Sequence, residues 1–332
     1  MFAQSTSELS SIPIRLWVAE YEGVKRYWIH GGKPYRQELV CKMEFYSLIR
    51  GSSVSPNRRF IVVALHAETL VIDVAARKWY NLTRSRRFPD GSYTLAIEYV
   101  RSWAPNNLYF LAADRLTSGA DMTVFSVSPP RLIRRFIANG EVKSVGWYPH
   151  SKHFFYTLAP KGQERQQSNL LSQPHYLLPI TGGRPRKLSR QEVSRLLTDW
   201  DYLAFRDTSF TSPNLVKYTL DRKMRVVYRD ERPQSLIVER RGGERRVLSV
   251  PAVANTPIEM YSVCDIDADH QRLLVMDIYW NFYVVRIADN SWGKIGNAAS
   301  FIPGDRSRKV PDIFVVEFVN TGYLFHSSGR FW

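Results

Sequence analysis

The hydrophobic residues of this chain fall in short runs that are separated by Pro, Asn, Asp and Gly. The runs are rich in β-branched and aromatic residues, which favour strands, and the residues between them favour turns. Helical periodicity is confined to Arg190–Thr198, where we predict a single short helix. The pattern therefore predicts an all-β chain.

The strands belong to an internal repeat. Each repeat has a tight polar turn, an apolar strand, a second strand, and a hairpin that leads into a basic and aromatic strand. Four repeats follow this order, at residues 55–83, 103–136, 147–189 and 267–295. The turn prolines recur about every 40–50 residues, which is the period of a four-stranded propeller blade; they are Pro56, Pro105 and Pro149. Because one blade cannot bury both of its faces, several blades must pack side by side.

Strand-forming sequence is present at both ends of the chain, at Ile313–Phe318, Tyr323–Phe325, Ile14–Tyr21 and Lys25–Ile29. We predict that the N-terminal segment completes the last blade, because this closure removes two exposed sheet edges that otherwise promote aggregation. Residues 191–250, with strand material expected from Trp200–Phe205 onward, match the repeat least. We interpret them as one blade with an inserted hairpin; two irregular blades are the alternative. The prediction is a single closed β-propeller domain over residues 1–332, with six four-stranded blades and seven as the alternative.

These repeats resemble the TolB-like relatives of WD40-like propellers, whose blades read roughly W-S-P-D-G, an apolar strand, G-G, a basic residue and L-T. The resemblance is strongest over residues 54–83 and 146–189. Two departures stand out: the turn glycine is replaced by Arg59, Asn107 or Lys152, and no WD dipeptide ends a blade. The resemblance implies a propeller that docks proteins or peptides, an implication that rests on fold analogy.

The distribution of charged residues predicts a basic surface on this fold. The 332 residues include 46 Lys and Arg against 31 Asp and Glu, a net charge of +15, while 44% of the residues are hydrophobic and suffice for a core. In a four-stranded blade the turns a–b and c–d lie at one end of the sheet, and here they are rich in Arg and Lys. We predict that ten of these residues form a partner-binding surface, the basic rim: Arg131, Arg134, Arg135, Arg184, Arg186, Lys187, Arg240, Arg241, Arg245 and Arg246.

The basic rim has three interpretations: an acidic protein partner, nucleic acid, or charge that only keeps the chain soluble. Nucleic-acid binding also requires exposed aromatic residues, for which the candidates are Tyr35, Trp79, Tyr80 and Trp292. A polar insertion at residues 159–173 carries Leu170 and Leu171, which we expect to anchor a protein partner. A loop without a role is the alternative for this insertion.

Catalytic and metal motifs are absent from the sequence: it has no G-x-S-x-G, H-E-x-x-H, Walker A or G-x-G-x-x-G pattern. Asp265, Asp267 and Asp269 have the spacing of calcium ligands, but His270 occupies the glycine position and Met276 the position of the bidentate acid. We therefore expect a structural turn there, and we expect His150 and His153 to be surface histidines without a metal. No metal and no cofactor is predicted.

The compartment is predicted from what the sequence lacks. It has two cysteines, Cys41 and Cys264, no secretory signal pattern, and no apolar run of about 18 residues, so we expect a cytoplasmic chain without membrane contact. The function predicted is a non-enzymatic interaction scaffold, a propeller subunit of a larger complex. The alternatives are a nucleic-acid-associated subunit and an enzyme with its site in the central funnel, since carboxylates that converge from different blades leave no linear motif.

Overall fold

The computed structural model describes residues 3–20, 22–43, 51–65, 68–82, 100–116, 119–140, 142–159, 173–203, 206–207, 216–219, 221–229, 234–253, 256–258, 260–302 and 312–319. The chain divides into two compact units, unit 1 with residues 1–46 and 213–331, and unit 2 with residues 47–212. That the two units form a single domain over residues 1–332 stays a prediction. Among the described residues, no helix is both long enough and apolar enough to cross a membrane.

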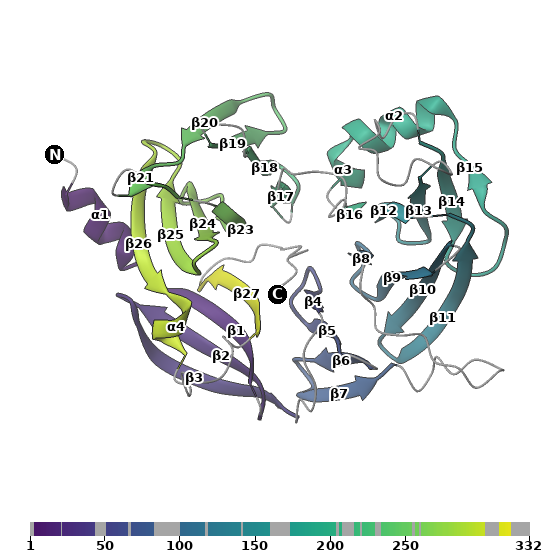
Figure 1. The fold of residues 1–332 in the computed structure, drawn as a ribbon, viewed down its shortest axis with the longest axis horizontal. Helices are drawn as coiled ribbons and strands as arrows, with labels where there is room; N and C mark the ends of the chain where they lie inside the picture. Colours follow the sequence, from purple (N-terminus) through teal and green to yellow (C-terminus); the bar gives the residue numbers. More distant parts are fainter. Residues whose placement is uncertain are drawn as a thin grey trace. The chain divides into compact units, whose positions relative to one another are not determined.

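The described strands form six antiparallel blades, so the all-β, six-bladed propeller is confirmed and the seven-bladed alternative is wrong (Figure 1). Unit 2 holds blades 1 to 3. Blade 1 consists of β4 (Gly51–Val54), β5 (Phe60–Ala64), β6 (Thr69–Asp73) and β7 (Lys78–Asn81). Blade 2 consists of β8 (Val100–Trp103), β9 (Tyr109–Leu116), β10 (Gly119–Val127) and β11 (Pro130–Ala138). Blade 3 consists of β12 (Val142–Trp147), β13 (His153–Leu158), β14 (His175–Pro179) and β15 (Arg186–Lys187).

Unit 1 holds blades 4 to 6. Blade 4 consists of β17 (Val216–Tyr218), β18 (Met224–Arg229), β19 (Ser235–Arg240) and β20 (Arg245–Ser249). Blade 5 consists of β23 (Met260–Asp267), β24 (Arg272–Asp277), β25 (Asn281–Arg286) and β26 (Ser291–Asn297). Blade 6 consists of β27 (Asp312–Phe318), β1 (Ile14–Glu20), β2 (Gly23–His30) and β3 (Lys33–Lys42). In this order the four strands of every blade are strands a, b, c and d.

The least regular region, residues 191–250, contains one blade, as interpreted from the sequence, but its described residues outside that blade form two helices and one short strand and not the expected inserted hairpin. The predicted helix is confirmed as α2 (Arg190–Thr198), with Ser189 as its N-cap. Residues 200–205, expected as strand material, begin instead with the helix α3 (Trp200–Leu203), whose Tyr202 is buried against Leu196 and Phe155. The short strand β16 (Arg206–Asp207) then pairs with β12, and a small hairpin of β21 (Ala252–Val253) and β22 (Thr256–Pro257) precedes blade 5.

Two further helices were not predicted from the sequence. They are α1 (Ala3–Ser10) and α4 (Ala298–Phe301), and both belong to unit 1. Leu9 of α1 packs so closely on β26 that a β-carbon at Gly293 would lie 2.5 Å from the Leu9 β-carbon. A helix of this length is too short to give a clear periodic pattern, and its packing decides its conformation.

The N-terminal segment completes the last blade, as predicted. Strand β1 pairs with both β2 and β27, so blade 6 is built from the two ends of the chain. Glu317 of β27 is fully buried and accepts hydrogen bonds from Arg15 and from the indole nitrogen of Trp17, the latter at 3.0 Å. On the same blade the guanidinium of Arg26 lies over the Trp17 ring, 4.1 Å from its centroid. Ion pair, indole hydrogen bond and cation–π contact together hold the two ends in register.

The turns between strands a and b repeat in detail from blade to blade. Three of them place a residue two positions after the turn proline in the left-handed region, at Arg58, Asn107 and Ser151. The sequence comparison had assigned the glycine position to Arg59, Asn107 and Lys152, which is one residue too far in two of the three blades. At the end of strand c, a backbone N–H donates to the carbonyl of the residue that directly precedes strand b: Val74 to Arg59, Val127 to Leu108, and Ile180 to Lys152. Turns a–b and c–d therefore lie at the same end of each blade.

Neighbouring blades of unit 2 are joined through their first strands. The Trp103 indole donates to the Ser53 hydroxyl at 2.9 Å, and the Trp147 indole donates to the Ser102 carbonyl at 3.1 Å. A buried cluster that includes Phe60 and Phe125 fills the space between blades 1 and 2. Corresponding clusters join blades 4 and 5, and blades 5 and 6, within unit 1. Packing of adjacent blades thus buries both faces of each inner sheet.

We expect Glu317→Ala to lower the free energy of unfolding by about 2–4 kcal/mol, because the substitution leaves the buried Trp17 N–H without an acceptor and Arg15 without its counter-charge. Denaturant unfolding measures the loss. Glu22→Ala is the matched control, since Glu22 pairs with Lys25 at 3.1 Å but is 67% exposed, and its loss should stay below about 1 kcal/mol. Equal losses for the two variants would contradict a central role for Glu317.

Candidate functional site

The basic rim residues of blades 2 and 3 are brought together by Arg134. This residue lies on β11, and its guanidinium donates to the carbonyls of Pro179 at 2.6 Å, Gly183 at 2.7 Å, and Gly182, all in the hairpin between β14 and β15. A guanidinium has five donors in a fixed planar fork, so it can hold several carbonyls at once. Arg134 is thus a structural residue that fixes the basic hairpin of blade 3 against the basic strand of blade 2.

Four other members of the predicted rim are engaged in ion pairs. Arg135 pairs with the buried Asp121 at 2.9 Å, and Arg186 makes a two-pronged contact with Glu192. In blade 4, Arg240 pairs with Glu244 at 3.1 Å, and Arg245 lies 3.8 Å from Glu239. The charge of these four arginines is partly neutralised within the fold.

The remaining members differ in what they contact. Arg131, Arg184, Lys187 and Arg246 are exposed, and in the described part of the chain no ion-pair partner lies beside them. The backbone N–H of Arg241 donates to the carbonyl of Lys223. Of the four unpaired cations, the first three belong to unit 2 and lie on the strand and hairpin that Arg134 joins. We call Arg131, Arg184 and Lys187 the unpaired basic cluster.

The turn ends of blades 1 to 3 extend this cluster into a continuous strip. The a–b turns are hydrogen-bonded to one another: Asn57 N–H donates to the Asn107 side chain at 2.9 Å, and Asn106 N–H donates to the Ser151 hydroxyl at 3.0 Å. The six turns between the described strands, at residues 55–59, 74–77, 104–108, 128–129, 148–152 and 180–185, contain no Asp or Glu and five cations: Arg58, Arg59, Arg77, Lys152 and Arg184. Arg131 follows on β11, and Asp73, the last residue of β6, pairs with Arg59 at 3.0 Å. Cations therefore outnumber acids at this end of the three blades.

Three of the four candidate aromatic residues are exposed. Tyr35 of β3 is 58% exposed, Trp79 of β7 is 45% exposed and Tyr80 of β7 is 38% exposed. Trp292 instead packs edge-on against Tyr283, and its indole donates to Asn290. The alternation along a strand could not distinguish these cases, because strand d has no outer neighbour and can expose side chains on both faces.

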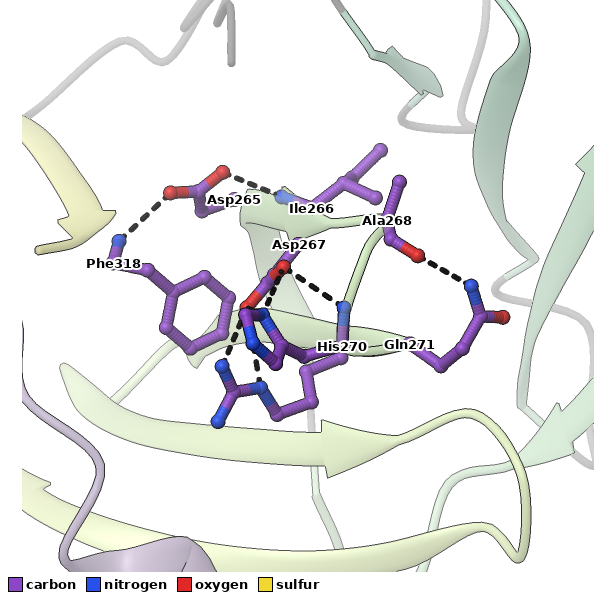
Figure 2. Close-up of polar contacts among 8 residues, drawn as sticks. Asp265, Ile266, Asp267, Ala268, His270, Gln271 and Phe318 are labelled. Carbon is purple, nitrogen blue, oxygen red and sulfur yellow. Dashed lines mark hydrogen bonds and ion pairs between the residues drawn. The ribbon is translucent and has the colours of Figure 1, made fainter. Parts of the chain in front are cut away.

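The acidic turn of blade 5 is structural, as expected from its sequence (Figure 2). The Asp267 carboxylate accepts from the His270 backbone at 3.1 Å, from the His270 ring at 3.0 Å and from Arg272 at 2.6 Å. Burial raises the pKa of Asp267, but the hydrogen bonds from Arg272 and His270 outweigh it, so the pKa lies below its usual value. Asp265 accepts from its own strand at Ile266 and from Phe318 N–H of blade 6 at 2.7 Å. These oxygens are occupied by donors and hold blades 5 and 6 together.

The histidines of blade 3 are also structural. His150 Nδ1 accepts the N–H of Lys152 at 3.0 Å, the same role that the Asn57 and Asn106 side chains have in the turns of blades 1 and 2. Burial lowers the pKa of His153, and the neighbouring His150, Arg186 and Lys152 lower it further, so a second cation is disfavoured there. Across the described residues, no group of three or more His, Cys, Asp or Glu side chains is arranged to hold a metal ion.

A buried ionisable group that sequence analysis missed lies on the first strands of blades 4 and 5. Lys217 of β17 is 6% exposed, and Cys264 and Asp265 of β23 are its charged or ionisable neighbours. Burial lowers the pKa of Lys217 to about 8 and raises that of Cys264 to about 12. No local pattern marks Lys217 in the sequence, because its neighbours come from a segment more than forty residues away. Leu170 and Leu171, the predicted loop anchors, lie outside the described residues.

The chain has only distant similarity to the known proteins reported below. No family model and no curated protein matches the chain. Among solved structures, the chain is similar to TolB from Acinetobacter baumannii, with 10% identity, 86% of this chain and 63% of that chain covered, and a TM-score of 0.39. It is also similar to a putative TolB from Agrobacterium tumefaciens (9% identity, 85% and 87% covered, TM-score 0.40) and to a nidogen/laminin complex (9%, 92% and 97%, 0.45). The chain thus spans less than two-thirds of the Acinetobacter TolB chain, and the propeller architecture rests on the six blades themselves.

We expect the free energy of unfolding to fall as the pH drops below about 4, in part because Asp267 must be protonated. The pKa of Asp267 is depressed in the folded state, so its contribution is complete above the pKa of the unfolded chain and is lost as the pH falls toward the folded value. Asp267→Asn should therefore flatten this decline in urea unfolding curves between about pH 5 and pH 2. Asp269→Asn, at an exposed position of the same turn, controls for net charge; an equal flattening there would contradict the assignment.

Proposed function

We propose that this chain is a non-enzymatic interaction scaffold, a propeller subunit of a larger complex, that binds a protein partner through its basic rim and inserted loop. The unpaired basic cluster carries the proposal, because Arg131, Arg184 and Lys187 are exposed cations without ion-pair partners among the described residues. Arg134 holds their two elements together through three backbone carbonyls. A rigidly mounted set of unpaired cations favours a partner that is acidic at the contact.

The charge distribution supports an electrostatic contact of this kind. The a–b and c–d turns of blades 1 to 3 carry five cations, of which Arg59 is paired with Asp73, and the excess of positive charge attracts an approaching acidic surface before any contact forms. The rim arginines that are already paired, such as Arg135 and Arg186, add less, since their carboxylate partners compete with any ligand. In blade 4 of unit 1, Arg241 and Arg246 are rim residues that we propose as contacts in their own right.

Nucleic acid is the second candidate, and one observation favours it. Strand β7 exposes Trp79 and Tyr80 directly after the exposed Lys78. Exposed aromatic rings beside cations are what single-stranded nucleic acid requires for base stacking and phosphate contact. We rank it second because the unpaired basic cluster of blades 2 and 3 has no comparably exposed aromatic residue among its described neighbours.

We make two further proposals: that the chain is not an enzyme, and that it is cytoplasmic. Four described residues with familiar catalytic chemistry, Asp265, Asp267, His270 and His150, are used to hold turns and blades together, which supports binding rather than catalysis. Both cysteines, Cys41 and Cys264, are free and buried, which is consistent with a reducing compartment and supports a cytoplasmic location.

Affinity purification of the full chain from its native source tests the scaffold function. We expect one acidic protein to co-purify with the wild type and to bind at least ten-fold more weakly to the triple variant Arg131→Glu, Arg184→Glu, Lys187→Glu, since each reversal replaces attraction by repulsion. The purified partner and calorimetry give the dissociation constants. A second variant, with Arg241→Glu and Arg246→Glu, shows how far the rim residues of unit 1 change the dissociation constant.

The matched control is Lys42→Glu, Arg229→Glu, Lys294→Glu, which changes the net charge equally at exposed positions away from the a–b and c–d turns. If this control weakens binding as much as the rim variant, net charge and not the cluster causes the effect. If neither variant weakens binding, the rim is not the contact. Tight binding of a mixed-sequence oligonucleotide, abolished by Trp79→Ser with Tyr80→Ser, would move nucleic acid to first place.

A further inference from the structure

The hairpin between β24 and β25 of blade 5 holds two large hydrophobic side chains out into solvent. It links Asp277 to Asn281, and its tip residues Ile278 and Tyr279 are 41% and 65% exposed. Tyr279 is the most exposed large hydrophobic residue among those that the structure describes. In a blade this turn joins strands b and c, so it lies at the opposite end of its sheet from the a–b and c–d turns of that blade.

The backbone of this turn is fixed by one buried carboxylate. Asp277 is 4% exposed and accepts four hydrogen bonds: from the N–H of Tyr279 and of Asn281, both at 2.9 Å, from the Asn281 side chain at 2.8 Å and from the Tyr283 hydroxyl at 3.0 Å. The Asn297 side chain also donates to the Tyr279 carbonyl at 2.8 Å. The exposed tip is thus far more constrained than an ordinary surface turn.

The third turn residue is held in a conformation that its side chain disfavours. Trp280 has a φ of +66°, in the left-handed region, where a three-residue hairpin usually has glycine. Such a conformation costs about 1–2 kcal/mol for a residue with a β-carbon. Here the Trp280 ring packs against the core between blades 5 and 6, and its carbonyl accepts from Ala298 N–H at 3.0 Å. Burial of Trp280 therefore orients Ile278 and Tyr279 outward, away from that core.

We infer that this turn is a preformed apolar anchor, with Ile278 and Tyr279 inserting into an apolar pocket of a folded protein partner. A rigid turn loses little conformational entropy on binding, and tyrosine is enriched among the residues that dominate binding energy. The tip has no charge to offer, because the Asp277 carboxylate is buried and its four hydrogen bonds are internal. The complementary surface is therefore an apolar pocket with a polar group for the Tyr279 hydroxyl. An anionic membrane fits less well, since the b–c turn of the adjacent blade 6 carries Glu22, which is 67% exposed.

The anchor extends the proposed scaffold function to a second contact of different chemistry. Contact through the unpaired basic cluster weakens steeply as salt rises, whereas an uncharged anchor does not. The two proposals can therefore fail independently.

Site-specific photo-cross-linking from position 279 identifies the protein in contact, in the full chain expressed in its native source. That protein is then purified and its dissociation constant measured for the wild type and variants. We expect Tyr279→Ser to weaken binding about 30-fold and Ile278→Ser by a smaller factor, with little change between about 50 mM and about 500 mM salt. Asp277→Ala should weaken binding mainly through faster dissociation, because Tyr279 is retained but no longer held.

Tyr35→Ser is the matched control, since Tyr35 is 58% exposed on strand β3 but belongs to no comparable turn; it should bind like the wild type. Thermal unfolding verifies that Tyr279→Ser remains folded. The inference is overturned if the captured protein binds Tyr279→Ser as tightly as the wild type, or if no protein is captured. Two other results also overturn the inference, since each assigns a different occupant. One is self-association in light scattering that depends on Tyr279. The other is binding to phosphatidylcholine vesicles containing phosphatidylglycerol that depends on Tyr279.

Discussion

The pairing of β27 with β1 is the interaction on which unit 1 depends, because it joins the two ends of the chain in one sheet. An antiparallel sheet that lacks its first strand exposes a row of unpaired backbone groups, and here that strand comes from about three hundred residues away. Glu317 secures the pairing by accepting from both Arg15 and Trp17 while it is itself fully buried. Blade 5 then packs on the face that blade 6 presents, with Asp265 accepting from Phe318 N–H across the interface. The core of this unit therefore requires the contact between the ends.

The same small set of polar side chains that elsewhere serves catalysis is used here to hold turns. Asn57, Asn106 and His150 occupy equivalent positions and accept equivalent backbone N–H groups, so a histidine performs the task of an asparagine. Because the turns are held internally, the cations that they carry are presented from a rigid base. A rigid base is the reason that we propose the basic surface of blades 2 and 3 as a recognition element, whereas isolated surface charges contribute little.

The two proposed contacts use different physical forces. The unpaired basic cluster acts over several ångströms and favours association, while Ile278 and Tyr279 act only on contact and slow dissociation. A scaffold benefits from both, since the first selects partners by charge and the second by shape. The unpaired basic cluster belongs to unit 2, and Ile278 and Tyr279 belong to unit 1, so each contact can be removed by substitution without changing the other.

The sequence by itself determined the all-β class and the blade repeat, because alternation and turn residues are local properties of the chain. It left six and seven blades as alternatives, which the strand pairing of the tertiary structure decided. It also predicted α2, whose capping residues Ser189 and Glu192 are only three positions apart in sequence, and the structural turn at Asp267, where the ligand pattern fails. It did not determine α3, where Tyr202 packs on blade 3, or which of the ten rim residues are paired, since Asp121 and the Pro179 carbonyl come from neighbouring strands and blades. Nor could the sequence identify Lys217 as a buried group, or the turn that carries Ile278 and Tyr279 as an apolar anchor. Burial, ion pairing and the outward orientation of Tyr279 are decided by contacts between segments far apart in the chain, and only the tertiary structure brings those segments together.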